Sequence, residues 1–229
     1  MKKYVVLLIA LSIASCNGQK NKKDNLVTKK NSEIKKVNSD KIINLTDIKF
    51  KTNIENLLGT YNLTLDDNAS NEYNVSGDYE EFRLESQNIS FFDEEISSKN
   101  SKLSFFYTKI DKILWCYELE VSNNNVIENI IKKFESKYGK TPAFSKVSIN
   151  TKEHPIFLDE NGEQEKDHME ERILVWEDIQ NKTTFFVIYK VNYSKKPIDN
   201  NIQIIAIDKN NKKYKEWISY RSLNMYYKK

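Results

Sequence analysis

The part of this chain that can fold is confined to residues 42–229. Residues 4–14 form an apolar run that is too short to cross a bilayer as a helix but has the length of the apolar core of a signal peptide. Residues 17–41 carry eight Lys against three Asp or Glu and few apolar side chains. Such a segment cannot bury enough surface to offset the entropy of ordering, so we expect a disordered tether. The remaining length suits a single domain.

The N-terminus has the three parts of a lipoprotein signal in their usual order. Lys2 and Lys3 form a positive region, the apolar run follows, and the run ends in the sequence IASC at residues 13–16. This string resembles the lipobox of bacterial lipoproteins. The resemblance implies that residues 1–15 are a cleaved signal peptide and that diacylglycerol is attached to the thiol of Cys16. The alternative is an ordinary signal peptide in which this Cys is incidental.

The resemblance also implies where the mature protein is held. Two or more acyl chains make a stable anchor, whereas a single chain holds a protein only marginally. A fully acylated Cys16 therefore keeps the domain on a membrane, at the end of a basic tether over residues 16–41. In bacterial lipoproteins an Asp after the Cys often marks retention at the inner membrane. The residue here is Asn17, which implies the outer membrane of the cell envelope and leaves the leaflet open.

The folded domain is mildly acidic, although the whole chain has a formal charge of +3. Without the signal peptide and the tether, 26 basic residues remain against 30 acidic ones. A domain that binds nucleic acid is expected to have a basic surface. The charge therefore argues against nucleic acid as a partner.

Two segments have the pattern of an amphipathic helix. In the first, Thr52 and Glu55 have the spacing of a capping box, and Gly59 lies where the helix could end. In the second, Asn125 precedes a longer apolar stripe that ends before Gly139. The apolar positions at helical spacing are Ile54, Leu57, Leu58 and Tyr61 in the first segment, and Ile127, Ile130, Ile131, Phe134 and Tyr138 in the second.

Most of the remaining sequence is typical of β-strands. Residues 113–121 alternate between an apolar set that begins at Trp115 and a set that contains Cys116, Glu118 and Glu120. This alternation predicts one packed face and one face that is at least partly wet, as in an antiparallel sheet. Cys116 has no disulfide partner once Cys16 is acylated, and we expect it to be partly buried. The predicted strands are residues 82–92, 102–110, 112–121, 172–179, 183–192 and 202–208.

Together these elements predict an α+β fold, with one or two antiparallel sheets of about six strands in total and two main helices packed on one face. The sequence IENLL at residues 54–58 is similar to IENII at 127–131. The sequence SFF at 104–106 is likewise similar to TFF at 184–186. Each helix is followed by three predicted strands. This repetition raises the hypothesis of a duplicated αβββ unit, with halves at residues 50–122 and 123–229.

Residues 153–171 form the most distinctive polar stretch, with eight carboxylates, both His and one Lys. Six residues fall at the ligand positions of an EF-hand calcium loop, but Gly162 lies at the fourth position rather than the sixth. Lys166 also replaces an apolar residue of such loops. We interpret Asn161-Gly162 as a hairpin turn followed by a solvated acidic loop, which is a candidate recognition surface; calcium is the alternative. The six residues are Asp159, Asn161, Glu163, Glu165, Asp167 and Glu170.

The sequence contains no recognisable catalytic or cofactor motif. The chain has five Gly, which leaves no glycine-rich phosphate loop, and His154 and His168 do not have the spacing of a helical zinc site. We therefore expect no metal and no other cofactor. Trp115 and Trp176 lie in strand patterns and are expected in the core. Residues 210–229, which are rich in Tyr, predict either a terminal helix or an extended aromatic segment.

These features favour a non-enzymatic lipoprotein that binds an envelope component or a secreted protein. One special case is an immunity protein that neutralises a toxin through its acidic face. A hydrolase that uses two carboxylates is the first alternative, because such enzymes need only two acids at a set separation. A small-ligand carrier is the second, and it predicts a cavity lined by residues such as Phe105, Phe185 and Val187.

Overall fold

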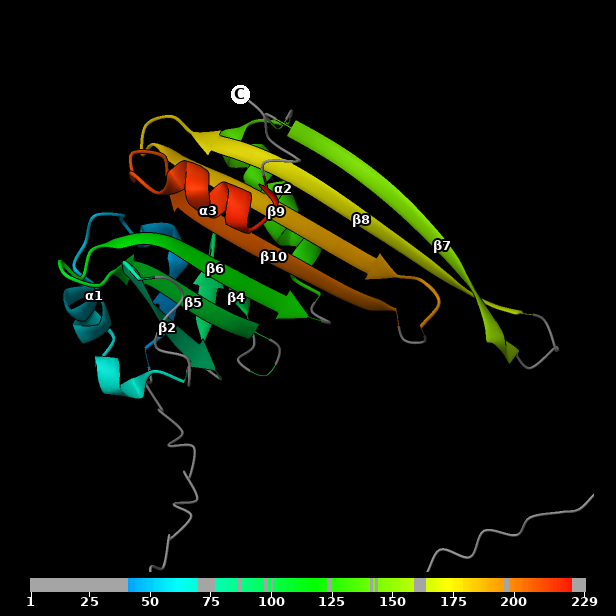
Figure 1. Cartoon of the computed structure of the whole chain (residues 1–229), viewed down its shortest axis with the longest axis horizontal. Helices are drawn as coiled ribbons and strands as arrows, with labels where there is room; N and C mark the ends of the chain where they lie inside the picture. The colour runs from blue at the N-terminus through cyan, green and yellow to red at the C-terminus, as the bar shows by residue number, and fades with distance from the viewer. Residues whose placement is uncertain are drawn as a thin grey trace, which may run out of the picture. The chain divides into compact units, whose positions relative to one another are not determined.

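The computed structural model describes residues 41–69, 77–85, 88–96, 99, 101–122, 125–140, 142, 144–158, 164–195 and 198–223 (Figure 1). Between residues 150 and 167 it describes no side chains. The described residues belong to one compact unit, residues 36–229. The predicted signal peptide, the lipidation site Cys16 and almost all of the tether lie outside them. None of the helices in these described ranges is long and apolar enough to span a bilayer.

A seven-stranded antiparallel sheet dominates the domain. Each strand pairs antiparallel with its neighbour, and the order is β2-β5-β6-β10-β9-β8-β7. The α+β class and the antiparallel sheet are confirmed, but the expectation of about six strands is wrong. The strand bounds are β2 Tyr79–Glu85, β5 Ser101–Thr108, β6 Leu114–Ser122, β7 Phe144–Leu158, β8 Gln164–Asp178, β9 Thr183–Asn192 and β10 Asp199–Asp208.

A second, three-stranded sheet consists of β1 (Ile43–Asn44), β3 (Ile89–Phe91) and β4 (Glu94–Ile96). β1 pairs parallel with β3, and β3 pairs antiparallel with β4. The predicted strand 82–92 is therefore two strands, because its first half belongs to β2 in the large sheet and its last residues to β3 in the small one. Two short 3-10 helices, Leu45–Asp47 and Leu65–Asp67, complete this half of the domain.

Both predicted helices are present, with small differences at their starts. The helix α1 (Ile54–Thr60) is capped by Asn53 rather than Thr52, because the Asn53 side chain accepts hydrogen bonds from the backbone N–H groups of Glu55 and Asn56. Gly59 lies inside this helix. The helix α2 (Ile127–Tyr138) starts without a side-chain cap and ends at Gly139, whose φ of 102° suits glycine.

The first face of the sheet carries the larger core. Buried residues of α1, α2, the small sheet and the central strands form one cluster, in which Phe134 of α2 is fully buried. Its ring stacks on Trp176 at a centroid distance of 5.0 Å and meets Phe185 edge-on at 5.3 Å. The apolar stripe of the second predicted helix thus does pack on the sheet, and Trp176 is a core residue as expected.

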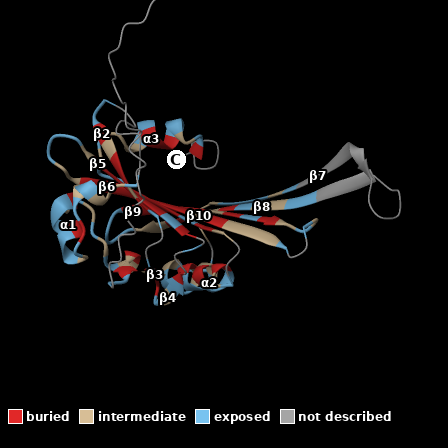
Figure 2. Cartoon of the chain, turned by 90° about the horizontal axis from the view of Figure 1, so that it is seen from below, coloured by how far each residue is buried: buried red, intermediate tan, exposed pale blue. Residues whose placement is uncertain are grey.

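The opposite face is covered by a third helix, α3 (Tyr214–Tyr220), which settles the alternatives for the tail in favour of a helix over these residues. Figure 2 shows α3 on one side of the sheet and α2 with β3 and β4 on the other. Trp217 packs on Trp115 and Phe106, with centroid distances of 5.0 and 4.8 Å. The face predicted to be partly wet is therefore dry. The prediction of two main helices on one face did not include α3, which covers the other face. Cys116 is 0% exposed.

The strand order has a symmetric form. β2, β5 and β6 follow α1 on one side, β8, β9 and β10 follow α2 on the other, and the two sets meet where β6 pairs with β10. Leu119 lies opposite Ile204 at this central junction.

Candidate functional sites

The acidic segment lies in a long hairpin rather than in a loop. β7 and β8 are 15 residues each, and they pair from Phe144 opposite Val175 to Leu158 opposite Gln164. β9 pairs with β8 only as far as Met169. The far part of the hairpin therefore extends beyond the sheet (Figure 1). The expectation of a solvated acidic loop after Gly162 is wrong for residues 164–171, because they belong to β8.

The residues of the proposed calcium loop are distributed along this hairpin. Asp159, Asn161 and Glu163 lie outside the described residues, as does the Asn161-Gly162 turn, while Glu165, Asp167 and Glu170 belong to β8. An extended backbone over residues 164–170 differs from the tightly turned EF-hand loop.

Glu170 already has protein partners. It pairs with Arg172 and accepts a hydrogen bond from the Tyr193 hydroxyl at 3.2 Å, and these contacts help to hold the pKa of its carboxyl below the usual value. The ring of His168 lies 5.2 Å from that of Tyr193. Among the described residues, no cluster of three or more His, Cys, Asp or Glu is arranged to hold a metal ion.

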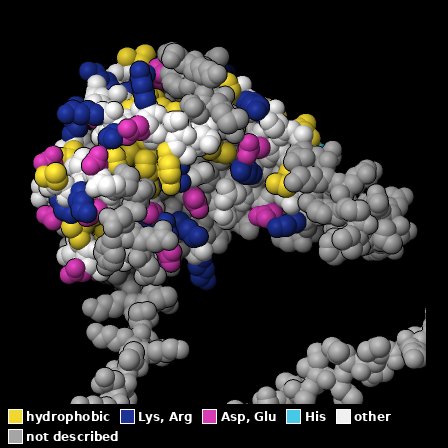
Figure 3. Space-filling view, viewed as in Figure 1, with side chains coloured by type: hydrophobic (Ala, Val, Ile, Leu, Met, Phe, Trp, Pro, Cys, Tyr) yellow, Lys and Arg dark blue, Asp and Glu magenta, His cyan; other side chains and the backbone are white. Residues whose placement is uncertain are grey.

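The outer edge of the hairpin has no strand beside it in the part of the chain that the structure describes. β7 ends the order of the large sheet, and β8 is the only strand that pairs with it among the described residues. Val147 and Ile149 are two residues apart in β7, so they share a face, and they are 55% and 66% exposed. Hydrophobic side chains are visible at the surface where the described part of the hairpin ends (Figure 3). An edge of this kind can pair with a strand from another chain.

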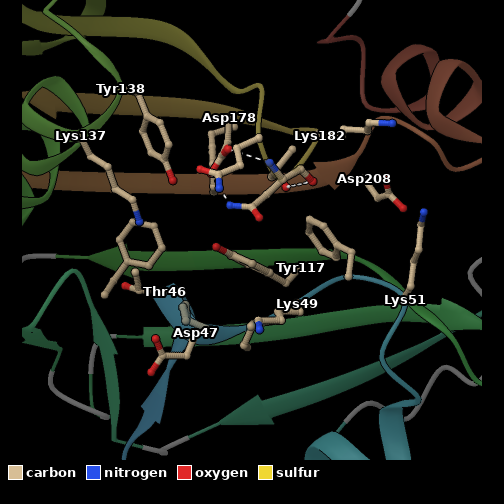
Figure 4. Close-up of a pocket in the computed structure, with 18 of the residues that line it drawn as sticks. Thr46, Asp47, Lys49, Lys51, Tyr117, Lys137, Tyr138, Asp178, Lys182 and Asp208 are labelled. Carbon is tan, nitrogen blue, oxygen red and sulfur yellow. Dashed lines mark hydrogen bonds between the residues drawn. The ribbon is translucent and has the colours of Figure 1, made fainter.

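A second candidate site is an open cleft of about 750 Å³ near the other end of β8. Segments that are far apart in the sequence line it (Figure 4). They are residues 45–51, Phe91 and Phe92 at the end of β3, Tyr117 on β6, the end of α2, the turn between β8 and β9 with the start of β9, and the end of β10. No sequence motif marks any of these segments, so the sequence analysis missed this site.

Aromatic rings form much of the cleft surface. Phe92, Tyr117, Tyr138 and Phe185 are among its lining residues. The ammonium group of Lys137 lies 5.0 Å from the ring centroid of Phe92 and 5.5 Å from that of Tyr138, which are cation–π distances. The cleft thus offers apolar surface with a positive charge beside it.

The carboxylates of the cleft are held by neighbouring polar groups. Asp178 accepts hydrogen bonds at 2.9 Å from both the backbone and the side-chain N–H of Asn181, and Asp208 does the same with Asn210 at 2.9 and 3.0 Å. Asp47 accepts a bond from the side chain of Asn44 at 2.8 Å. These acids therefore stabilise turns and the start of a short helix.

The lysines of the cleft are used differently. Within the described part of the chain, Lys49, Lys51, Lys137 and Lys182 form no salt bridge. Their charges are consequently available to a ligand, whereas the carboxylates already have donors. The cleft is electrostatically suited to an anion.

Two tyrosine hydroxyls reach the cleft. Tyr117 is 3% exposed and extends its hydroxyl toward the side of Lys137 and Tyr138 (Figure 4). Burial raises the pKa of Tyr117 well above the usual value. Burial and the Asp178 carboxylate raise the pKa of Tyr138. Both groups therefore stay protonated and act as O–H donors at neutral pH.

The second face holds a buried ion pair that is separate from the cleft. Arg221 donates to Glu118 at 2.8 Å, yet burial raises the pKa of Glu118 to about 7. Cys116 lies in the core on the same face of the sheet, packed in one cluster with Trp115 and Trp217. Burial raises the pKa of its thiol well above the usual value. A buried thiol of this kind is unreactive.

The predicted carrier cavity is not where it was expected. Phe105 and Val187 are packed in the core with 1% and 0% exposure, and only Phe185 of the three lines the cleft. Comparisons with protein families, with curated proteins and with solved structures find no match to this chain.

Proposed function

We propose that this protein is a lipid-anchored protein of the bacterial cell envelope that acts by binding another protein through the β7–β8 hairpin. The observation that carries the proposal is the outer edge of β7, which no described strand covers, with Val147 and Ile149 exposed on a hairpin that extends beyond the sheet. A partner strand that adds to such an edge gains main-chain hydrogen bonds along its length. Exposed apolar side chains at every second position then select the partner's side chains.

The charge of the hairpin indicates the chemistry of the partner. Residues 153–171 carry eight carboxylates and one Lys, so a basic segment of a protein is the complementary occupant. Such charge favours rapid association and rejects acidic chains. A basic secreted toxin is one partner of this kind, which corresponds to the immunity-type role.

The anchor follows from the resemblance of residues 13–16 to a lipobox. Acylated Cys16 would hold the domain at the outer membrane, and the basic tether would let the hairpin reach partners near that surface. Replacement of Cys16 by Ser should move the protein to the soluble fraction, whereas Cys116→Ser should leave it on the membrane.

A binding role is supported over a catalytic one by how the carboxylates are used. Asp178 and Asp208 in the cleft accept hydrogen bonds from the side chain and backbone of turn residues, and Glu118, whose pKa is raised, lies beneath α3 against Arg221. A glycosidase needs two carboxyl groups that face one open cleft and take opposite roles.

We also infer that the domain arose by duplication of an αβββ unit, with halves at residues 50–122 and 123–229. The support is that three strands of each half form one side of the large sheet, and that the last strands of the two halves, β6 and β10, pair at its centre. If the two copies are related by a two-fold axis perpendicular to the sheet, the helix of each copy lies on the same face. The extra strand β7 then belongs to the second half alone.

The test uses the mature chain from residue 16, with Cys16→Ser to keep it soluble. Immobilised protein is exposed to envelope and secreted fractions of the source cell, and retained proteins are identified by mass spectrometry. We expect one basic protein to be retained in a saturable way, with retention that weakens as salt is raised from about 50 to about 300 mM.

The same capture with Val147→Lys and Ile149→Lys tests the site. Two charges on the edge strand should abolish retention, since edge lysines prevent strand pairing. The matched control is Ile110→Lys with Ile179→Lys, two isoleucines that are 91% and 85% exposed in turns. The proposal would be contradicted if both double variants retained the partner equally, or if the parent chain retained no protein in a saturable way.

A further inference from the structure

We propose that the cleft bounded by residues 45–51 and the β8–β9 turn binds a small anionic ligand with an apolar body, such as a carboxylate, phosphate or sulfonate on an aromatic ring or an acyl chain. This site is independent of the hairpin. The cleft adjoins Asp178, at one end of the 15-residue strand β8, and the hairpin tip adjoins Gln164, at the other. A strand of this length spans on the order of 50 Å.

The first argument is the difference between the acids and the bases that line the cleft. Asp178 and Asp208 each accept two hydrogen bonds from a turn asparagine, so their charge is balanced by fixed donors. Lys49 and Lys51 have no salt-bridge partner in the part of the chain that the structure describes. An incoming anion therefore meets positive charge without first breaking an ion pair, and this lowers the cost of binding.

The second argument is the Tyr117 hydroxyl. This side chain is 3% exposed, it lies among the residues that line the cleft, and its hydroxyl reaches into the cleft in Figure 4. It has a ring contact with Phe50 at 6.0 Å, but no hydrogen-bond partner among the described residues. Because this hydroxyl opens into the cleft, a ligand oxygen that enters the cleft can accept a hydrogen bond from it.

The third argument is the apolar surface beside these polar groups. Phe92, Tyr138 and Phe185 present rings to the cleft, and Lys137 lies over the first two of them. A cleft of about 750 Å³ falls within the usual range for small-molecule sites. Apolar walls with a few polar groups at fixed positions favour a ligand that combines a ring or chain with a single charged head.

The test is a fluorescence titration of the mature chain carrying Cys16→Ser with 8-anilinonaphthalene-1-sulfonate. The neutral comparison is N-phenyl-1-naphthylamine, which has the same rings and no sulfonate. We expect saturable binding of the anion, with an affinity about tenfold higher than that of the neutral probe, which is the effect of about one charge-assisted hydrogen bond.

Variants locate the binding. Lys49→Gln with Lys51→Gln should reduce the affinity for the anion to that for the neutral probe. Lys102→Gln with Lys132→Gln removes the same charge from exposed positions that do not line the cleft, and should change nothing. Tyr117→Phe should lower the affinity for the anionic probe severalfold. Its unfolding temperature should stay near that of the parent, which excludes a loss of fold.

Competition distinguishes the two sources of such a ligand. Displacement by dodecanoate and not by phenyl phosphate would assign an acyl anion, and the reverse would assign an aromatic one. Displacement by neither would contradict the proposal. Equal affinity for the charged and neutral probes, or an unchanged affinity in the Lys49/Lys51 variant, would also overturn it. None of these results depends on β7, so the failure of one site is separable from that of the other.

Discussion

Glu118 is a carboxyl group in an environment that does not favour its charge. It lies on β6 beneath α3 with 6% exposure, and only one of its oxygens is bonded, to Arg221. The other oxygen has no partner in the described part of the chain, nor does the Nε of Arg221. Loss of hydration therefore exceeds the attraction of the guanidinium, which explains why the pKa of Glu118 is raised to about 7.

The raised pKa makes stability depend on pH. Between about pH 4.5 and 7 the unfolded chain ionises Glu118 while the folded protein keeps it protonated, so the free energy of unfolding falls as pH rises. The expected loss is about 3 kcal/mol across this window. Urea denaturation at several pH values measures it. Glu118→Gln should remove this slope, and Glu120→Gln, at an exposed position of the same strand, should retain it; a slope that survives in Glu118→Gln contradicts the assignment.

At this scale the sequence predicted that Cys116 and Glu118 alternate with Tyr117 and Leu119, but it placed Trp115 on the wrong face. The two-residue period of a strand holds from Cys116 onward. Trp115 departs from it because the pairing of β5 with β6 shifts register at this point, so Trp115 packs beside Cys116 under α3. Burial of the second face depends on Trp217, which is about a hundred residues away along the chain. A local pattern that mixes Cys and Glu resembles a wet face, and only the position of α3 shows that the face is dry.

Among the elements, α3 is the short helix that covers the second face of the sheet. Its packing rests on Trp217 between Trp115 and Phe106, with Arg221 stacked 5.1 Å from the Trp217 ring. Trp217→Ala should lower the free energy of unfolding by about 3 to 5 kcal/mol, as for other buried aromatic residues.

The same variant should expose Cys116 to thiol reagents. In a Cys16→Ser background Cys116 is the sole thiol, and its burial predicts very slow labelling of the parent protein. Trp217→Ala should label much faster, whereas Tyr220→Ala, at a position of α3 that is 67% exposed, should label nearly as slowly as the parent. Equal labelling rates in the parent and Trp217→Ala would show that α3 does not shield this face.

The elements also differ in how far the sequence defines them. α1 and α2 were predictable because their apolar stripes and their ends are local signals. β7 was not, because the polar residues Ser145, Lys146 and Ser148 interrupt its apolar residues, and Val147 and Ile149 remain exposed. A strand at the edge of a sheet buries little and therefore carries a weak apolar pattern.

For the whole molecule, the large sheet links two candidate sites with different chemistry. The hairpin offers an edge of backbone with a strongly acidic sequence beyond it, and the cleft offers lysines over aromatic rings. The sequence predicted the first in part, since it singled out residues 153–171 as a recognition surface, although as a loop. It could not predict the second, because the segments that line the cleft are far apart in the sequence and come together only when β8, β9 and β10 align beside the small sheet.

The central claim is that a partner adds a strand to β7, and hydrogen exchange of the backbone amides tests it most directly. The mature chain would be compared alone and in complex with its captured partner, by mass spectrometry of peptides over β7. Amides of residues 144–149 that face away from β8 should exchange more slowly in the complex, because the added strand bonds them. A complex in which these residues exchange as in the free protein, while another surface is protected, would contradict the account.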